Sequence, residues 1–226
     1  MDAKYVDFFE SKLNLYNIGN GKYKVEELPE LPNKYCYRIF KRIFDFVCAL
    51  IGIVVCAIPM LIIAIIIKLD SPGPVFFSQS RLGKNGKPFN IIKFRSMRLD
   101  AEKHGAQWAK RDDDRATKVG KFLRASRIDE IPQLFNILLG QMSIVGPRPE
   151  RKVFYDEFEK YITGFDQRLT IIPGLTGFAQ INGGYDLEPE EKIIFDVEYI
   201  KKRSVLLDIR IIFSTVKVIF THEGAR

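Results

Sequence analysis

The chain has 226 residues, of which 46% are hydrophobic and 28% are charged, and its formal net charge at pH 7 is +7. A chain of this length buries one good core, so a single domain of catalytic size with appendages is expected. Three cysteines, an odd number, argue against a disulfide framework and a thiolate metal site, and the two histidines are isolated. The sequence has no Walker or dinucleotide-binding pattern, which argues against the familiar nucleotide-binding folds. It also has no zinc-finger pattern, which argues against nucleic acid as a partner.

Residues 1–35 are interpreted as an N-terminal extension to which the sequence assigns no role. Residues 5–15 have short helical potential, and Pro29 and Pro32 end the extension. Four lysines against six acidic residues make residues 1–33 mildly acidic, so the remainder of the chain is strongly basic. A basic body suits an anionic lipid surface and phosphorylated substrates.

An uncharged stretch of 22 residues, Phe46–Ile67, follows the extension. As a helix it would span about 33 Å, enough for the hydrocarbon layer of a bilayer, whereas a buried core helix is rarely so long and apolar on all sides. Pro59 predicts a sharp bend, and the basic residues at both ends favour placing both ends in the cytoplasm. We therefore predict a re-entrant membrane helix over residues 36–70, broken at Pro59, in preference to a straight span.

The main domain is expected to comprise residues 71–226. After S-P-G-P at 71–74, two strands are predicted to join in a tight hairpin at Asn85-Gly86. Lys93, Arg95 and Arg98, in or just after the second strand, are candidate anion binders, although a purely structural hairpin explains most of the residues of this segment.

The rest of the domain alternates helices with polar loops. Residues 99–115, with the acidic run at 112–114, are interpreted as a solvated loop, followed by a helix near Lys118–Arg124 and a second helix that stops at Gly140. A turn-rich segment and a charged helix lead to an apolar stretch at 206–220. This stretch is expected either to pack in the core or to lie flat on a lipid surface.

Two adjacent carboxylates, Asp129 and Glu130, precede Pro132. Because proline is tolerated in the first turn of a helix, Asp129 could serve only as an N-cap, worth about 1 kcal/mol. A functional interpretation is favoured by the surroundings, since a helix N-terminus, Arg124 and Arg127 gather positive charge that can hold a diphosphate. An ionised aspartate can then attack phosphorus, while a neighbouring glutamate supplies the oxygen ligand that Mg²⁺ prefers.

Several ordered motifs run from about residue 38 to the C-terminus. They are K-R-I-F-D at 41–45, S-P-G-P-V-F-F-S-Q at 71–79, G-K-P-F-N-I-I-K-F-R-S-M at 86–97, D-R-A-T-K-V-G-K-F-L-R at 114–124, D-E-I-P-Q-L-F-N at 129–136, M-S-I-V-G-P-R-P at 142–149 and P-G-L-T-G-F-A-Q-I-N-G at 173–183. In this order the chain resembles the bacterial sugar transferases, the monotopic polyprenyl-phosphate phosphoglycosyl transferases.

The resemblance implies a small, helix-rich α/β (α+β) catalytic domain of family-specific fold, anchored by the re-entrant helix and by interfacial amphipathic helices. It implies transfer of a sugar-1-phosphate from a UDP-sugar to undecaprenyl phosphate at the cytoplasmic face of the bacterial inner membrane, with release of UMP, as the first step of surface glycan assembly. By the same resemblance Asp129 is the nucleophile that forms a phosphosugar intermediate, and Glu130, together with Asp129, binds Mg²⁺.

Further contacts are expected from residues within the matching motifs. Phosphate or substrate binding is expected from Lys93, Arg95, Arg124, Arg148 and Gln180, and contact with polyprenyl phosphate or the membrane from Lys41, Arg42, Asp45 and Pro59. Two positions depart from the family pattern: Ile58 stands where serine often precedes the proline, and Ile172 where arginine often precedes P-G-L-T-G.

Two other functions remain open at this stage. A membrane-tethered glycosyl transferase would release UDP, but only the run at 112–114 matches a D-x-D metal motif, and that match is formal. A non-catalytic membrane adaptor would show no magnesium-dependent release of nucleotide. The sequence specifies neither the sugar, nor the glycan pathway, nor whether copies of the chain associate as a homo-oligomer.

Overall fold

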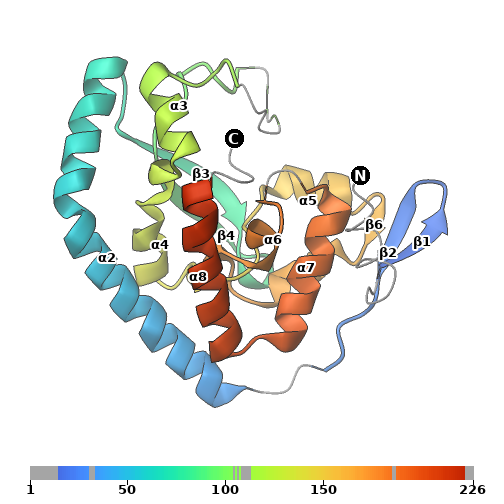
Figure 1. Ribbon diagram of the computed structural model, residues 1–226. Coiled ribbons are helices and arrows are strands. Elements are labelled where there is room, and N and C mark those ends of the chain that lie inside the picture. The colour runs from blue at the N-terminus through green and yellow to red at the C-terminus, as the bar shows by residue number, and fades with distance from the viewer. Residues whose placement is uncertain are drawn as a thin grey trace.

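The computed structural model describes residues 15–30, 34–103, 105, 107, 113–184 and 187–221. Its strands are β1 (Leu15–Gly19), β2 (Lys22–Val25), β3 (Phe76–Leu82), β4 (Pro88–Phe94), β5 (Ser143–Val145), β6 (Ile162–Thr163) and β7 (Gly174–Thr176). Its helices are α2 (Tyr35–Asp70), α3 (Lys118–Ala125), α4 (Gln133–Leu138), α5 (Lys152–Phe158), α6 (Phe178–Ile181), α7 (Pro189–Lys202) and α8 (Val205–Thr221), with 3-10 turns η1 (Lys84–Gly86), η2 (Ile128–Glu130) and η3 (Phe165–Thr170). This helix-rich mixture agrees with the predicted α/β class (Figure 1).

The described strands form small sheets. Strands β1, β2 and β6 make one sheet, β3 and β4 an antiparallel hairpin, and β5 and β7 a parallel pair. The predicted hairpin is confirmed, but Leu82 pairs with Pro88, so the connection is longer than a two-residue turn. Asn85 and Gly86 have φ angles of 57° and 71°, a left-handed conformation that asparagine and glycine tolerate best.

Helix α2 is continuous through Pro59. Figure 1 shows it along one side of the molecule, changing direction part-way along its length. An internal proline removes one backbone donor and bends a helix without necessarily ending it. The predicted break is therefore a bend within one uninterrupted helix.

The composition and exposure of α2 are those of a membrane helix. It is long and apolar enough to cross a bilayer, and only 11% of its most apolar 18 residues are buried against the rest of the molecule. Large apolar side chains such as Val54, Val55 and Ile58 are exposed on its outer face. A core helix would bury such side chains, so the structure favours membrane association.

Polar residues in the N-terminal half of α2 fasten the helix to the domain. Lys41 Nζ lies 2.9 Å from Asp208 Oδ2 on α8, and Arg42 donates to two backbone carbonyls at the C-terminal end of α4. The buried Asp45 accepts a hydrogen bond of 3.0 Å from the backbone N–H of Ile144 on β5. Lys41, Arg42 and Asp45 thus dock α2 onto the domain, and their contact with polyprenyl phosphate or the membrane stays a prediction.

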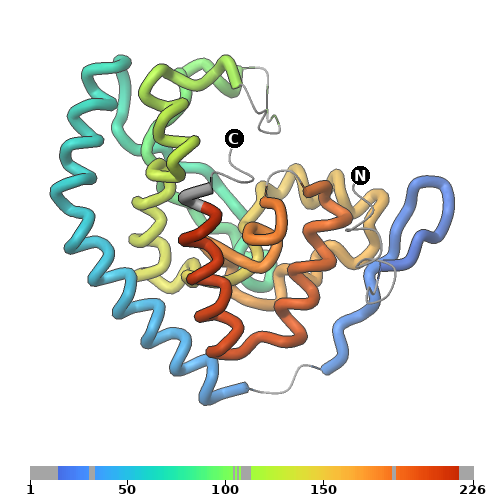
Figure 2. Tube along the Cα trace, in the orientation of Figure 1, coloured from blue at the N-terminus to red at the C-terminus, as the bar shows by residue number. Residues whose placement is uncertain are grey.

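The N-terminal extension adds a strand to the domain. Strand β2 pairs in parallel with β6, and Val25 is 2% exposed in a core shared with α5 and β6. The Gln167 side chain holds the segment after β2 through two hydrogen bonds. Its Oε1 accepts from Leu28 N at 2.6 Å, and its Nε2 donates to the Glu26 carbonyl at 3.1 Å. The short helix expected over residues 5–15 falls almost entirely on positions 1–14, which the structure does not describe, and Leu15 begins β1. Figure 2 shows the β1–β2 hairpin on the side of the molecule away from α2.

The C-terminal helices complete the core. Helix α7 begins with a capping box between Glu188 and Glu191 and has Pro189 in its first turn, and most of its side chains are buried. Helix α8 buries Ile211 and exposes Phe213. One face of the apolar stretch near the C-terminus therefore packs on the core, while contact of its exposed face with a lipid surface stays a prediction.

Candidate active site

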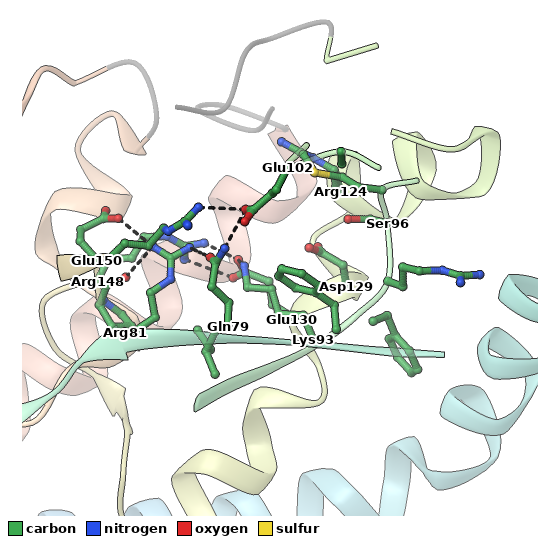
Figure 3. Close-up of a pocket in the computed structure, with 18 of the residues that line it drawn as sticks. Gln79, Arg81, Lys93, Ser96, Glu102, Arg124, Asp129, Glu130, Arg148 and Glu150 are labelled. Atoms are coloured by element: carbon green, nitrogen blue, oxygen red, sulfur yellow. Dashed lines mark hydrogen bonds and ion pairs between the residues drawn. The ribbon is translucent and has the colours of Figure 1, made fainter. Parts of the chain in front are cut away.

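A pocket of about 320 Å³ contains the carboxylate pair. It lies between the β3–β4 hairpin and the chain that links α3 to α4, and the loop around Arg148 and helix α6 complete its wall (Figure 3). The structure brings together the residues that were expected to act on or bind the substrate, since the pocket is lined by Asp129, Glu130, Lys93, Arg95, Arg124, Arg148 and Gln180.

The chain reaches the carboxylate pair through a left-handed turn. Helix α3 starts after Thr117, whose hydroxyl oxygen accepts from Gly120 N at 2.9 Å, as an N-cap does. Arg127 follows the helix with a φ of 57°. A residue other than glycine rarely adopts this conformation, which is concentrated at functional sites. This turn directs the next residues into the pocket.

The structure excludes the alternative in which Asp129 is only the N-cap of the following helix. Asp129 and Glu130 lie in the 3-10 turn η2, and α4 starts at Gln133 with Pro132 in the N-cap position. The proline does lie at a helix start, where its missing N–H costs nothing, but the boundary comes later than predicted. Neither carboxylate is used to cap α4, so both are available to the pocket.

Glu130 is held by two cations. Lys93 Nζ lies 2.7 Å from Oε1, and Arg148 donates to both carboxylate oxygens (Figure 3). Burial alone would raise the pKa of Glu130, but Arg148 and Lys93 outweigh burial and hold this pKa well below its usual value. Glu130 is therefore ionised and fixed in orientation at neutral pH.

Asp129 is buried beside this cluster, and no described residue donates a hydrogen bond to its carboxylate (Figure 3). Burial raises the pKa of Asp129 to about 6, an effect that Lys93 opposes and Glu130 reinforces. Two adjacent carboxylates thus have pKa values that their surroundings push apart. Such a separation is typical of paired carboxylates with different chemical roles, and Asp129, unlike Glu130, receives no hydrogen bond from the described residues that would fix its orientation.

The remaining expected contacts fall into two groups. Arg124 and Gln180 line the pocket, and the Gln180 amide is buried without a hydrogen-bond partner among the described residues, so it is available to a ligand. Arg95 also lines the pocket, but its guanidinium donates at 2.7 Å to the Ser71 carbonyl and at 2.8 Å to the next carbonyl, just beyond α2. Arg95 thus secures the end of α2, and its contact with an anion stays a prediction.

The rim of the pocket contains acidic residues that the sequence analysis did not identify. Glu102 accepts hydrogen bonds from Gln79 at 2.8 Å and Arg151 at 2.9 Å, and Glu150 pairs with Arg81 at 3.1 Å (Figure 3). These contacts join the loop after β4 to β3 and α5. Gln79 and Arg81 are two apart on β3 and so share one face of the strand, a periodicity that could have indicated a common environment.

The acidic run at 112–114 is only partly the solvated loop that was expected. Asp114 is exposed, but Asp113 is buried, and its oxygens accept from the Arg115 guanidinium at 2.7 and 2.6 Å. Hydrogen bonding to Arg115 lowers the pKa of Asp113 to about 2. Asp112 lies outside the described residues.

The carboxylate pair offers oxygen atoms of the kind that Mg²⁺ prefers as ligands. Across the described ranges, which omit 104, 106 and 108–112, no three acidic, cysteine or histidine side chains form a closed metal cage. Mg²⁺ does not need one, since one or two carboxylates suffice when substrate phosphates complete its ligand shell. Asp129 receives no hydrogen bond from the described residues and Glu130 Oε2 receives one, from Arg148 at 3.3 Å, so both retain lone pairs for a cation.

Comparison with known proteins identifies the family. The sequence profile described as "Bacterial sugar transferase" matches residues 36–222. The chain belongs to the bacterial sugar transferase family. All the strands and helices that line the pocket fall within the match, whereas the β1–β2 hairpin of this bacterial sugar transferase precedes it.

This bacterial sugar transferase is similar to several relatives whose names state an activity. It is 44% identical over 215 residues to the UDP-N-acetylgalactosamine-undecaprenyl-phosphate N-acetylgalactosaminephosphotransferase of Aeromonas hydrophila, a match that covers 91% of this chain and 51% of the relative. Two UDP-glucose:undecaprenyl-phosphate glucose-1-phosphate transferases also match. That of Escherichia coli K12 is 42% identical over 206 residues (89% of this chain, 44% of the relative), and that of Xanthomonas campestris pv. campestris is 46% identical over 173 residues (74% and 36%). The chain thus spans about half the length of these relatives or less.

Proposed function

We propose that this bacterial sugar transferase moves a sugar-1-phosphate from a UDP-sugar to undecaprenyl phosphate and releases UMP, as the first step in building a surface glycan. The names of the relatives support the classes of donor and acceptor. One observation supports the chemistry: in a cationic pocket, Glu130 is held by Lys93 and Arg148, while the adjacent Asp129 carboxylate receives no hydrogen bond from the described residues.

The proposed reaction has two displacements at one phosphorus atom. In the first, an Asp129 carboxylate oxygen attacks the sugar-bound phosphorus of the donor, and the bond from this phosphorus to the bridging oxygen breaks, so that UMP leaves with the electron pair. In the second, a phosphate oxygen of undecaprenyl phosphate attacks the same phosphorus. The bond to Asp129 breaks, the carboxylate is restored, and the product is an undecaprenyl diphosphate sugar.

The neighbouring residues would lower the repulsion between an anionic nucleophile and an anionic substrate. Arg124 and Arg148 line the pocket on either side of the pair and would bind the donor phosphates, with Lys93 fixing Glu130 between them. Mg²⁺ bound by Glu130 and Asp129 would neutralise charge on the diphosphate. The free Gln180 amide would donate and accept hydrogen bonds at the wall of the same pocket.

The membrane arrangement proposed is a re-entrant α2 with both ends on the cytoplasmic face of the inner membrane. The bend in α2, its exposed apolar surface and the basic residues at both ends support this arrangement. It would keep the pocket next to the lipid-linked acceptor and open to soluble UDP-sugar.

The decisive experiment identifies the nucleotide product and the enzyme adduct. Purified protein in detergent is mixed with a UDP-sugar and Mg²⁺, with and without undecaprenyl phosphate. UMP is expected with acceptor, and without it a single burst of UMP together with a mass increase of one sugar phosphate on the intact protein. UDP as the product, or turnover without an adduct in quenched samples, would contradict the proposal.

Asp129→Asn is the matching variant, since it retains shape and removes the nucleophilic charge. It is expected to fold normally, form no adduct and lose all but a trace of UMP release. Asp156→Asn is the control, because Asp156 pairs with Lys152 at an exposed position of α5. Substantial turnover by Asp129→Asn would remove Asp129 as the nucleophile.

A further inference from the structure

A buried ion pair lies behind the loop that carries Arg148. Arg168 of η3 and Asp196 of α7 approach to 2.7 Å, and their side chains are 2% and 1% exposed. The rings of Phe165 and Tyr155 lie 4.9 and 5.9 Å from the guanidinium carbon of Arg168. The guanidinium is therefore oriented by a carboxylate on one side and by aromatic rings on others.

The ion pair makes a direct connection to the active-site loop. Arg168 Nη2 donates to the Arg148 carbonyl at 3.0 Å, and the carbonyl of Pro147 accepts from Gly174 N at 2.9 Å. Prolines on both sides of Arg148 further restrict its backbone. From this fixed backbone the Arg148 side chain reaches both oxygens of Glu130. A continuous chain of contacts thus runs from Asp196 through Arg168 and Arg148 to Glu130.

Stability alone does not explain such a pair. Removing two charges from water costs several kcal/mol per ion, and replacing a buried pair by apolar residues of similar size is often neutral or stabilising. The rings of Phe165 and Tyr155 that pack on the guanidinium could equally pack on apolar side chains, although the charges of Glu150 and Lys192 also act on the pair. What apolar side chains could not supply is the hydrogen bond to the Arg148 carbonyl.

We infer that Arg168 and Asp196 are positioning residues for the transfer reaction. Asp196 orients Arg168, Arg168 fixes the backbone of Arg148, and Arg148 holds Glu130 in the orientation that the reaction needs. This inference rests on the proposed function of the pocket. Arg168 also lines the pocket, but the contact that carries the inference is its hydrogen bond to the Arg148 carbonyl, which is made to protein backbone.

The first test replaces both charges in the variant Arg168→Met/Asp196→Leu. We expect the variant to fold, with a thermal midpoint in detergent close to that of the wild type, and kcat for nucleotide release to fall about 10- to 100-fold, as is common for outer-shell residues that orient a site. KM for the UDP-sugar is expected to stay within about threefold of the wild type, because the lost interaction acts on the transition state. A folded variant with wild-type kcat, or with a loss confined to KM, would overturn the inference.

A second test asks whether Arg168 acts through Arg148. In a double-mutant cycle, Arg168→Lys is compared in the wild type and in an Arg148→Met background. Lysine retains the charge beside Asp196 but lacks the planar fork that serves Asp196 and the Arg148 carbonyl together. Arg168→Lys is expected to lower kcat in the wild type and to have little further effect without the Arg148 guanidinium. If Arg168→Lys lowers kcat by the same factor in both backgrounds, the two residues act independently and the positioning role is contradicted. This outcome is decisive even if the doubly apolar variant fails to fold.

The matched control is Lys202→Gln, which breaks the exposed pair of Lys202 with Glu198 on the same helix α7 and should leave kcat unchanged. Total nucleotide release is measured in every variant, and the product is separately identified as UMP or UDP. UDP from the wild type would refute the proposed function, whereas the effect of Arg168 on kcat would still be read from the same assays. The two ideas can therefore fail independently.

Discussion

Asp129 and Glu130 are neighbours in sequence and both are buried, yet their partners make them chemically different. Glu130 is fixed by Lys93 and Arg148, whereas Asp129 has only electrostatic contact with these cations. The difference in pKa follows from this asymmetry, since burial raises both values and only Glu130 has hydrogen-bonded cations to reverse the effect.

The rate of adduct formation should depend on the ionisation of Asp129. A carboxylate attacks only when deprotonated, so at limiting Mg²⁺ the rate is expected to fall as pH decreases through about 6, the pKa of Asp129. Raising the Mg²⁺ concentration adds positive charge beside Asp129 and should move this acid limb to lower pH. Single-turnover measurements across pH at two Mg²⁺ concentrations check both expectations. An acid limb that does not respond to Mg²⁺ would argue against a cation at the pair.

Lys93→Met should move the same acid limb to higher pH. Lys93 favours the charged form of Asp129, so its removal stabilises the protonated acid. The measurement is the same single-turnover profile, and Lys87→Met, on the exposed hairpin connection, is the control. An unchanged acid limb would show that the charge of Lys93 is not felt at Asp129.

The sequence predicted the identity of the pair but not the partners of the surrounding cations. Asp129, Glu130 and Arg148 lie within motifs, and their chemistry follows from residue type. In the sequence, however, a lysine or arginine that binds phosphate cannot be distinguished from one that binds a backbone carbonyl. Arg95 and Arg42 bind backbone carbonyls at helix ends far from them in sequence, and only the folded arrangement reveals that.

At the scale of secondary-structure elements, close backbone contact between two motifs shapes the pocket wall. A Cβ atom at Gly174 would lie 2.1 Å from Gly146 N, and one at Gly177 would lie 2.2 Å from Gly146 O. Only glycine permits this approach, which sets β7 against the loop leading to Arg148. The motifs M-S-I-V-G-P-R-P and P-G-L-T-G therefore form one structural unit, although 28 positions separate Gly146 from Gly174.

The β1–β2 hairpin shows where the sequence analysis was limited. Its strands are short, and the sheet is completed only by β6, well over a hundred residues later. Local periodicity cannot reveal a partner so distant, and the extension consequently seemed to have no role. The hairpin of β3 and β4 was predictable because both strands and their turn residues are contiguous.

Val25→Ala should destabilise the domain although Val25 lies outside the region matched to the family. Val25 is 2% exposed, and losing two buried carbon atoms together with the resulting cavity costs about 2 kcal/mol. The midpoint of thermal unfolding in detergent should therefore fall by several degrees. Ile18→Ala on β1, where Ile18 is 56% exposed, should change the midpoint little. Equal midpoints for both variants and the wild type would indicate that the hairpin does not contribute to the folded core.

At the scale of the whole molecule, α2 is both a membrane-type helix and part of the domain. Its outer face is apolar and exposed, while its inner face packs on α3 and α4 and is fastened through Lys41, Arg42 and Asp45. The sequence predicted the membrane character of α2 from composition. It could not predict how much of the helix lies against the domain, because the contacting residues of α4 and α8 lie about a hundred or more positions away.

A re-entrant α2 places both of its ends on one side of the membrane. Two variants are compared, and both carry Cys48→Ala and Cys56→Ala. One retains Cys36 near the start of α2, and the other carries Cys36→Ala together with Leu69→Cys near its end. Cys36 is exposed and Leu69 is 82% exposed, so both thiols can react. A membrane-impermeant maleimide should label neither in intact cells and both after permeabilisation. Labelling of one end in intact cells would instead show that α2 crosses the membrane.

The lateral attachment of α2 also has a mechanical consequence. Because the helix is fastened to the domain at Lys41, Arg42 and Asp45, the depth at which it would settle in lipid would fix the elevation of the carboxylates relative to the headgroup plane. Under the proposed function, every lipid-linked acceptor would then meet the pocket at one constant height. Bilayer thickness and headgroup packing would consequently tune turnover from outside the protein, without touching any residue of the pocket.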